Sequence, residues 1–153
     1  MKTVTWALVL GVGNGARAGI IGALAYVVAH GILRLAWDAH DPGYVIFSTL
    51  IGFIYGIVIG GVLGAIVGSL SGPLLAIFGV VRVAFIVGII FGGIAGWFLG
   101  AVPPFPPETG TFVDPVALQW YHLLTRLLAS LCGALGGFLG GRHFWTSFRK
   151  RVT

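Results

Sequence analysis

The sequence predicts an all-α integral membrane protein, folded as a bundle of four transmembrane helices. Of its 153 residues, 58% are hydrophobic and only 8% are charged, and the mean hydropathy is +1.02. A soluble domain carries about 25% charged residues. Glycine is unusually frequent, with 26 residues, and it lies inside the apolar segments rather than between them. These observations together favour helices that are packed closely within a lipid bilayer.

Each expected helix is an apolar segment bounded by charges or prolines and long enough to cross about 30 Å of hydrocarbon. The four predicted spans cover residues 18–37, 44–71, 83–102 and 117–141. The segment 1–17 is predicted to extend the first helix on the inner side, because Asn14 and Arg17 leave it too short for a separate span.

The remaining segments complete one transmembrane domain over residues 1–153. An outer loop is expected at 103–116, where the stretch "PPFPPETGTFVDP" is too rich in proline for a helix or a sheet. The second span is expected to end before Pro73 for the same reason. Residues 142–153 are expected to form a basic cytoplasmic tail, whose alternating basic and aromatic residues suit an anionic membrane surface.

The glycines recur every fourth residue, which predicts helix packing of the GxxxG type, a glycine zipper. The series in the second, third and fourth spans are Gly52, Gly56, Gly60, Gly64, Gly68 and Gly72; Gly88, Gly92 and Gly96; and Gly133 and Gly137. Gly11, Gly15 and Gly19 continue the pattern near the N-terminus. Small residues let backbones approach closely in lipid. We therefore expect a tight bundle with little internal volume, centred on the second helix and with different neighbours at its two ends.

Charge placement predicts the orientation, because cytoplasmic flanks of spans retain Lys and Arg. Seven basic residues fall on one side: Lys2, Arg17, Arg82, Arg142, Arg149, Lys150 and Arg151. All four carboxylates fall on the other: Asp38, Asp41, Glu108 and Asp114. Both termini are therefore expected in the cytoplasm, with the chain in a bacterial inner membrane.

Two polar pairs recur at i,i+4 and so share a helix face. They are His30 with Arg34, and His122 with Arg126. Adjacent first and fourth helices would let the two histidines ligate a haem or a pigment metal; ordinary hydrogen-bonded histidines are the alternative. Each arginine is a candidate contact for a lipid, a partner subunit or an acidic cofactor group, and snorkelling to headgroups is the alternative for Arg126.

The spans contain no Asp or Glu and no nucleophile paired with a base, so we expect no enzyme, no metal site and no firmly predicted cofactor. The scattered basic residues, although they give a net charge of +5, do not form a nucleic-acid patch. We expect a structural or accessory subunit of a larger membrane complex, for example an energy-transducing one, with lipids and other membrane subunits as partners. A homo-oligomeric small channel or transporter is one alternative, and a haem- or pigment-binding membrane subunit is another.

Overall fold

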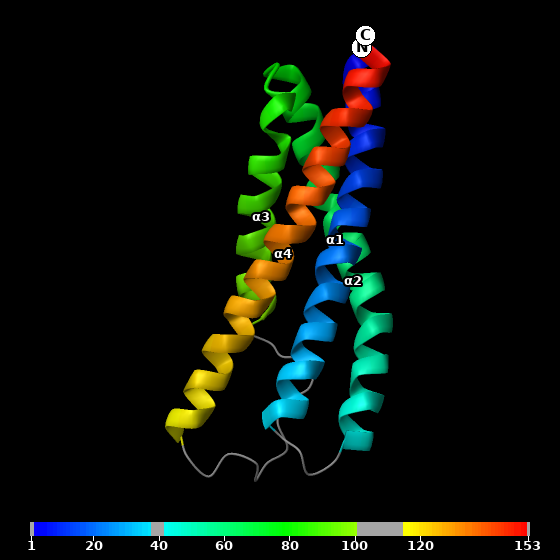
Figure 1. Ribbon diagram of the computed structural model, residues 1–153. Helices are drawn as coiled ribbons and strands as arrows, with labels where there is room; N and C mark the ends of the chain where they lie inside the picture. The colour runs from blue at the N-terminus through cyan, green and yellow to red at the C-terminus, as the bar shows by residue number, and fades with distance from the viewer. Residues whose placement is uncertain (1, 38–41, 101–114, 153) are drawn as a thin grey trace.

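The computed structural model describes residues 2–37, 42–100 and 115–152. These residues form four long helices and one 3-10 turn, and no strand occurs among them. The helices are α1 (Lys2–Trp37), α2 (Pro42–Ile77), α3 (Ala84–Leu99) and α4 (Pro115–Val152), with η1 (Val81–Val83) between α2 and α3 (Figure 1). The prediction of an all-α chain is therefore confirmed. The predicted loop 103–116 lies almost entirely outside the described residues, and the four carboxylates lie entirely outside them.

All four helices are long and apolar enough to cross a membrane. The candidate spans are Thr3–Ala36, Pro42–Ile77, Val81–Leu99 and Pro115–Arg151. Their large aliphatic and aromatic side chains are widely exposed on the isolated chain, among them Ile54, Phe98 and Leu131. An apolar exterior of this extent belongs in lipid, as in an integral membrane protein.

Three helices extend beyond the predicted spans. α1 includes the segment 1–17 from Lys2 onward, and α4 runs through the predicted tail to Val152. α2 continues through Pro73 to Ile77, so the predicted end at residue 71 is wrong. Proline is tolerated within membrane helices, since neighbouring helices and Ser or Thr side chains can satisfy the freed backbone groups.

Gly79 lies in the turn that terminates α2 after Ile77. Its φ of 66° is the left-handed conformation that glycine adopts without steric cost. The Gly79 N–H donates to the Ala76 carbonyl at 3.2 Å, and the Val80 N–H donates to the Leu75 carbonyl at 3.0 Å. This pair of hydrogen bonds is a Schellman motif, which satisfies the last carbonyls of the helix and turns the chain toward α3.

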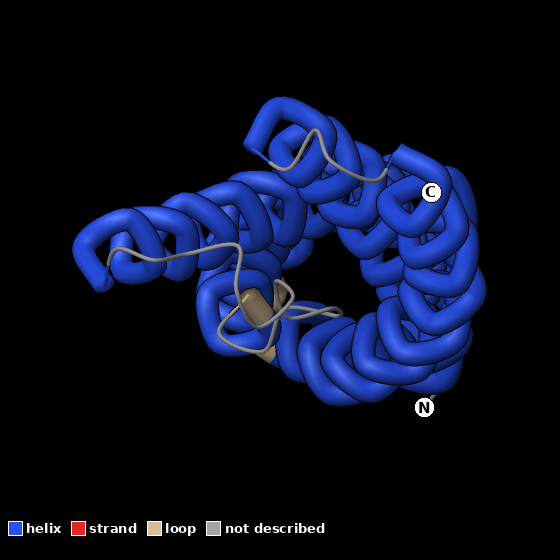
Figure 2. The backbone as a smooth tube through the Cα atoms, turned by 90° about the horizontal axis from the view of Figure 1, so that it is seen from below, coloured by secondary structure: helices blue, strands red, loops and turns tan. Residues whose placement is uncertain are grey.

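The helices pack in the order α2, α1, α4, α3. α1 packs along both α2 and α4, and α3 packs along α4, whereas the described residues of α2 and α3 form no comparable interface. Figure 2 shows the helices arranged around a central axis. The expectation that the second helix lies at the centre is therefore wrong. The reason is that α1 carries small residues on two faces, one against α2 and one against α4.

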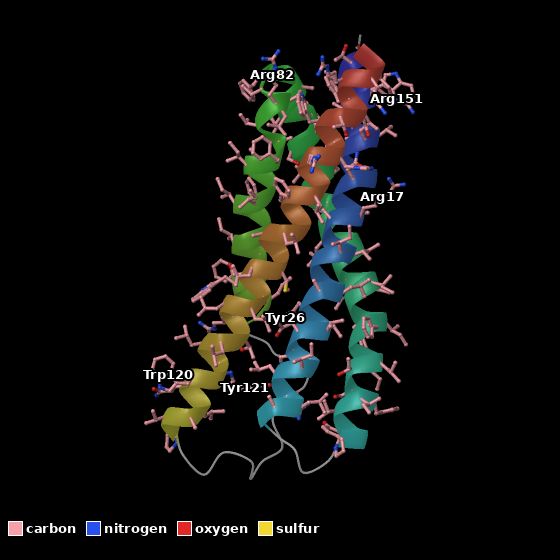
Figure 3. The ribbon with its side chains drawn as sticks, viewed as in Figure 1. Arg17, Tyr26, Arg82, Trp120, Tyr121 and Arg151 are labelled. Carbon is pink, nitrogen blue, oxygen red and sulfur yellow. The ribbon has the colours of Figure 1, made fainter. Side chains whose placement is uncertain are left out.

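The beginning of α1 and the end of α4 lie at the same end of the bundle, together with the α2–α3 connection (Figure 1). A cation–π contact ties the first two together, since the Arg151 guanidinium carbon lies 4.1 Å from the centroid of the Trp6 ring. Arg17 and Arg82 also lie toward this end of the molecule (Figure 3). We call it the basic end.

Candidate functional site

The glycine series of α2 lies against α1 along its length. A Cβ atom added to Gly64 would strike the carbonyl oxygen of Gly15, and one added to Gly68 would strike that of Gly11. The remaining pairs continue this register: Gly72 with Ala7, Gly60 with Gly19, and Gly56 with Ala23. Gly52 is buried in α2. One partner helix thus covers the series from 56 to 72, and the expectation of different neighbours at its two ends is wrong.

The second hairpin repeats this arrangement with different residues. Cβ atoms added to Gly88, Gly92 and Gly96 would strike the carbonyl oxygens of Gly137, Gly133 and Ala129 in α4. In each hairpin, therefore, the helices touch through their backbones at intervals of one turn. A larger side chain at these positions would meet backbone rather than a flexible side chain, so the helices themselves would have to move apart.

A third close approach joins the two hairpins through α1 and α4. A Cβ atom at Gly136 would strike the Ala18 carbonyl oxygen, and one at Gly22 would lie 3.1 Å from the Cys132 carbonyl oxygen. α4 thus presents Gly133 and Gly137 to α3 and the offset Gly136 to α1. Two series on one helix allow it to pack against two neighbours.

An elongated cleft of about 680 Å³ lies between the two hairpins. Helices α1 to α4 all contribute to its wall, in which glycine is the most frequent residue type. On α1 it extends from Gly11 to Val27, about 24 Å at 1.5 Å per residue. The expectation of little internal volume is therefore wrong. The glycines bring the helices together in pairs, but α2 and α3 do not close the fourth side.

The two ends of the cleft differ in chemistry. Toward the basic end its lining residues Leu75, Ala84 and Phe144 belong to a buried apolar cluster that also contains Ala7 and Val81. The other end is lined by Val27, Leu99 and the aromatic ring of Tyr26. The Tyr26 hydroxyl is buried and has no hydrogen-bond partner among the described residues.

Tyr26 adjoins a buried polar cluster that joins α1 to α4. The His30 Nε2 atom and the Tyr121 hydroxyl are hydrogen-bonded at 2.9 Å, and these residues are only 4% and 1% exposed. The Tyr26 and His30 ring centroids are 5.5 Å apart. Next to Tyr121, the fully buried Thr125 hydroxyl donates to the His122 carbonyl at 2.9 Å. Tyr26 and Tyr121 appear at the α1–α4 junction in Figure 3.

The residue of α4 that bonds to His30 is Tyr121 rather than His122. The His122 ring lies beside Tyr121, with 6.1 Å between the centroids. The bond to Tyr121 occupies the Nε2 atom of His30, one of the two ring nitrogens that can ligate a metal. Within the described ranges, no group of three or more His, Cys, Asp or Glu residues could hold a metal ion.

Each candidate arginine lies over an aromatic ring of its own hairpin. The Arg34 guanidinium carbon is 5.4 Å from the Tyr44 ring centroid, and that of Arg126 is 5.9 Å from the Trp97 centroid. Arg34 is only 3% exposed, so it faces protein rather than lipid. The Arg126 Nε atom is buried and has no hydrogen-bond partner among the described residues. Desolvated cation–π contacts of this kind contribute roughly 2 kcal/mol.

The sequence reasoning missed Tyr26 and Tyr121, although a signal for the first was present. Tyr26 and His30 are spaced i,i+4 and therefore share a helix face. Tyr121 gives no comparable signal, because its role depends on which face of α4 meets α1.

Comparison of the chain with protein-family models, with curated proteins and with solved structures gives no match.

Proposed function

We propose that this chain is a structural subunit of a larger complex in a bacterial inner membrane, such as an energy-transducing complex. The observation that supports the proposal is the direct backbone contact along three helix interfaces. We propose that these glycines act as zippers of the GxxxG type, since helices in lipid associate through van der Waals contact between closely approaching backbones. Such contact would fix the relative positions of the spans and suits a subunit that holds neighbours in place.

In the proposed orientation both termini are cytoplasmic. The orientation is supported by the basic end, toward which Arg17, Arg82 and Arg151 lie, because cytoplasmic flanks of spans retain Lys and Arg. The 38 residues of α4 reach about 57 Å as a helix, well beyond about 30 Å of hydrocarbon. We propose that its basic and aromatic C-terminal part projects from the bilayer and contacts anionic headgroups and other subunits.

The test is extraction of the native membrane in a gentle detergent, followed by size separation with absorbance detection and mass spectrometry. We expect the chain to migrate in fixed stoichiometry with other membrane subunits. Replacing Gly64 by Leu should release the chain from the other subunits, because the packing of α1 against α2 would be disrupted. Gly13→Leu is the matched control, since a Cβ atom at Gly13 meets nothing within 4 Å.

Two other outcomes would overturn the proposal. A colourless assembly that contains only this chain would favour the homo-oligomeric channel or transporter. A haem or pigment absorbance band that is lost on His30→Ala or His122→Ala would favour the cofactor-binding subunit instead.

The cleft gives the transporter a specific argument as second candidate. A cavity of about 680 Å³ inside a membrane bundle has the size of a small-molecule site, for which about 300–1,000 Å³ is typical. Because glycines and apolar side chains dominate its lining, such a transporter would carry an apolar molecule rather than an ion. Uptake of a labelled apolar compound into vesicles that contain only this chain would test that function.

A further inference from the structure

We infer that Arg126 binds the phosphate group of an anionic phospholipid in the leaflet opposite the basic end. The head group lies beside the Trp97 ring, and the acyl chains lie along the exposed apolar face of α3. The site is separate from the cleft, because neither Arg126 nor Trp97 is among the residues that line the cleft. It goes beyond the proposed structural role and does not depend on it.

The end of α3 defines the depth of Arg126 in the membrane. Together with η1, α3 forms the shortest candidate span, Val81–Leu99, of 19 residues. This span is about 28 Å long at 1.5 Å per residue, which matches the hydrocarbon thickness of about 30 Å. A Cβ atom added to Gly100, directly after the span, would lie 2.9 Å from the Arg126 Cα atom. Arg126 therefore lies at the boundary between hydrocarbon and head groups, where lipid phosphates occur.

The positive charge of Arg126 has no compensating carboxylate in the described part of the chain, since all four carboxylates lie outside it. The Nε atom is buried without a hydrogen-bond partner among the described residues. The Trp97 ring, 5.9 Å from the guanidinium carbon, attracts a cation but carries no net charge. Because Arg126 as a whole is only half-buried, the outer part of its guanidinium is accessible. The planar fork of donors there matches the oxygens of a phosphate.

The surroundings of Arg126 favour a lipid over an acidic residue of a partner subunit. Ile90 and Ile94 lie on the same face of α3 as Trp97, seven and three residues before it, and each is 52% exposed. They form an apolar strip that ends at the level of Arg126, as acyl chains below a phosphate require. On α4, His122 shares the helix face of Arg126 and offers a further N–H donor.

The net charge of the head group selects the class of lipid. In phosphatidylcholine the phosphate is accompanied by the positive charge of its own choline, whereas phosphatidylglycerol carries a net negative charge. An arginine that is partly removed from water and has no carboxylate beside it gains more from the anionic lipid. We therefore expect phosphatidylglycerol to be enriched at this site.

The test measures which lipid lies next to Trp97. The chain keeps Trp97 as its single tryptophan, and Phe replaces the other four, Trp6, Trp37, Trp120 and Trp145. In nanodiscs, its fluorescence is quenched by phosphatidylglycerol or, in a parallel sample, by phosphatidylcholine, each with a nitroxide on the upper part of an acyl chain. We expect stronger quenching by phosphatidylglycerol at equal lipid fractions. Arg126→Gln should lower this preference about 10-fold or more, the effect of losing a hydrogen bond to a charged group.

Two further variants separate the site from charge in general. Arg82→Gln removes the same charge at the other end of the same span and should leave the preference unchanged. Arg126→Lys keeps the charge but loses the planar fork, so it should retain part of the preference. Circular dichroism confirms that each variant is as helical as the parent chain.

Three outcomes would overturn the inference. The first is an equal preference in the parent chain and in Arg126→Gln. The second is no preference in the folded parent chain, which would assign Arg126 to an acidic residue of a partner subunit instead. The third is loss of the preference when inorganic phosphate is added at constant ionic strength, because the site would then bind a soluble anion rather than a lipid.

Discussion

The α1–α2 and α2–α3 pairs are each consecutive in the chain, yet only the first packs along its length. The difference lies in the direction of the glycines. Those of α2 face α1, and those of α3 face α4, so neither series is available between α2 and α3. In lipid there is no hydrophobic force that draws apolar helices together, and close packing at small residues decides which of them associate. The placement of small residues, rather than the connection along the chain, therefore sets the neighbours and leaves the cleft open.

The most direct way to break this comparison is to remove one packed interface. Gly64→Leu places a side chain against the Gly15 carbonyl oxygen, and the backbone cannot yield as a side chain would. We expect a loss of at least about 3 kcal/mol in the free energy of unfolding, measured by denaturation in mixed detergent micelles. Gly92→Leu should do the same in the α3–α4 hairpin, where the Gly133 carbonyl oxygen lies in the way.

The control for this pair is Gly13→Leu, which should leave stability unchanged or slightly raised. A Cβ atom there has open space, and glycine within a helix is less favourable than most other residues. If all three variants unfolded alike, close backbone packing would not be what distinguishes the two regions.

The α1–α4 interface combines small residues with a buried polar contact, and the contribution of that contact can be measured separately. Tyr121→Phe removes the hydroxyl and leaves the His30 Nε2 atom without this 2.9 Å hydrogen bond. We expect a loss of about 1–3 kcal/mol in unfolding free energy, because a buried polar group would lose its partner.

A double-mutant cycle with His30→Phe distinguishes a hydrogen bond from a simple change in packing. The effect of Tyr121→Phe should largely vanish when His30 is already Phe. Additive effects of the two substitutions would contradict a direct interaction between these side chains.

The sequence predicts the individual helices of this fold but not which helices pack together. Apolar length and glycine spacing are local properties, so the spans and the small residues in them could be read directly. The helix that packs against each glycine series could not be predicted, because a four-residue repeat looks the same whichever helix lies against it. The cleft and the His30–Tyr121 bond depend on that choice of partners and therefore could not be predicted. The predicted end of α2 is wrong because proline does not break this helix, which stops instead before the left-handed Gly79.

The connection between α2 and α3 sharpens the comparison, because it joins helices that do not pack. Gly79→Ala places a side chain at a φ of 66°, which costs an L-residue roughly 1–2 kcal/mol. A Cβ atom there meets nothing within 4 Å, so the cost is purely conformational. We expect the free energy of unfolding in detergent to fall by this amount. The decrease should be smaller for Gly79→Asn, because asparagine tolerates the left-handed region better. Equal stability of the wild type and Gly79→Ala would show that the turn relaxes freely.

The smallest expected effect concerns the contact that joins the ends of α1 and α4. Trp6→Leu keeps an apolar side chain but removes the ring that lies 4.1 Å from the Arg151 guanidinium carbon. An exposed cation–π contact contributes about 0.5–1 kcal/mol, and Trp6 is 41% exposed, so the change in unfolding free energy should fall in that range. Hydrogen exchange of the last turns of α4 should increase while the glycine-packed middle stays protected. An equal increase in both regions would mean that the basic end and the packed middle open together, and the glycine interfaces would then not be independent of the contacts beyond them.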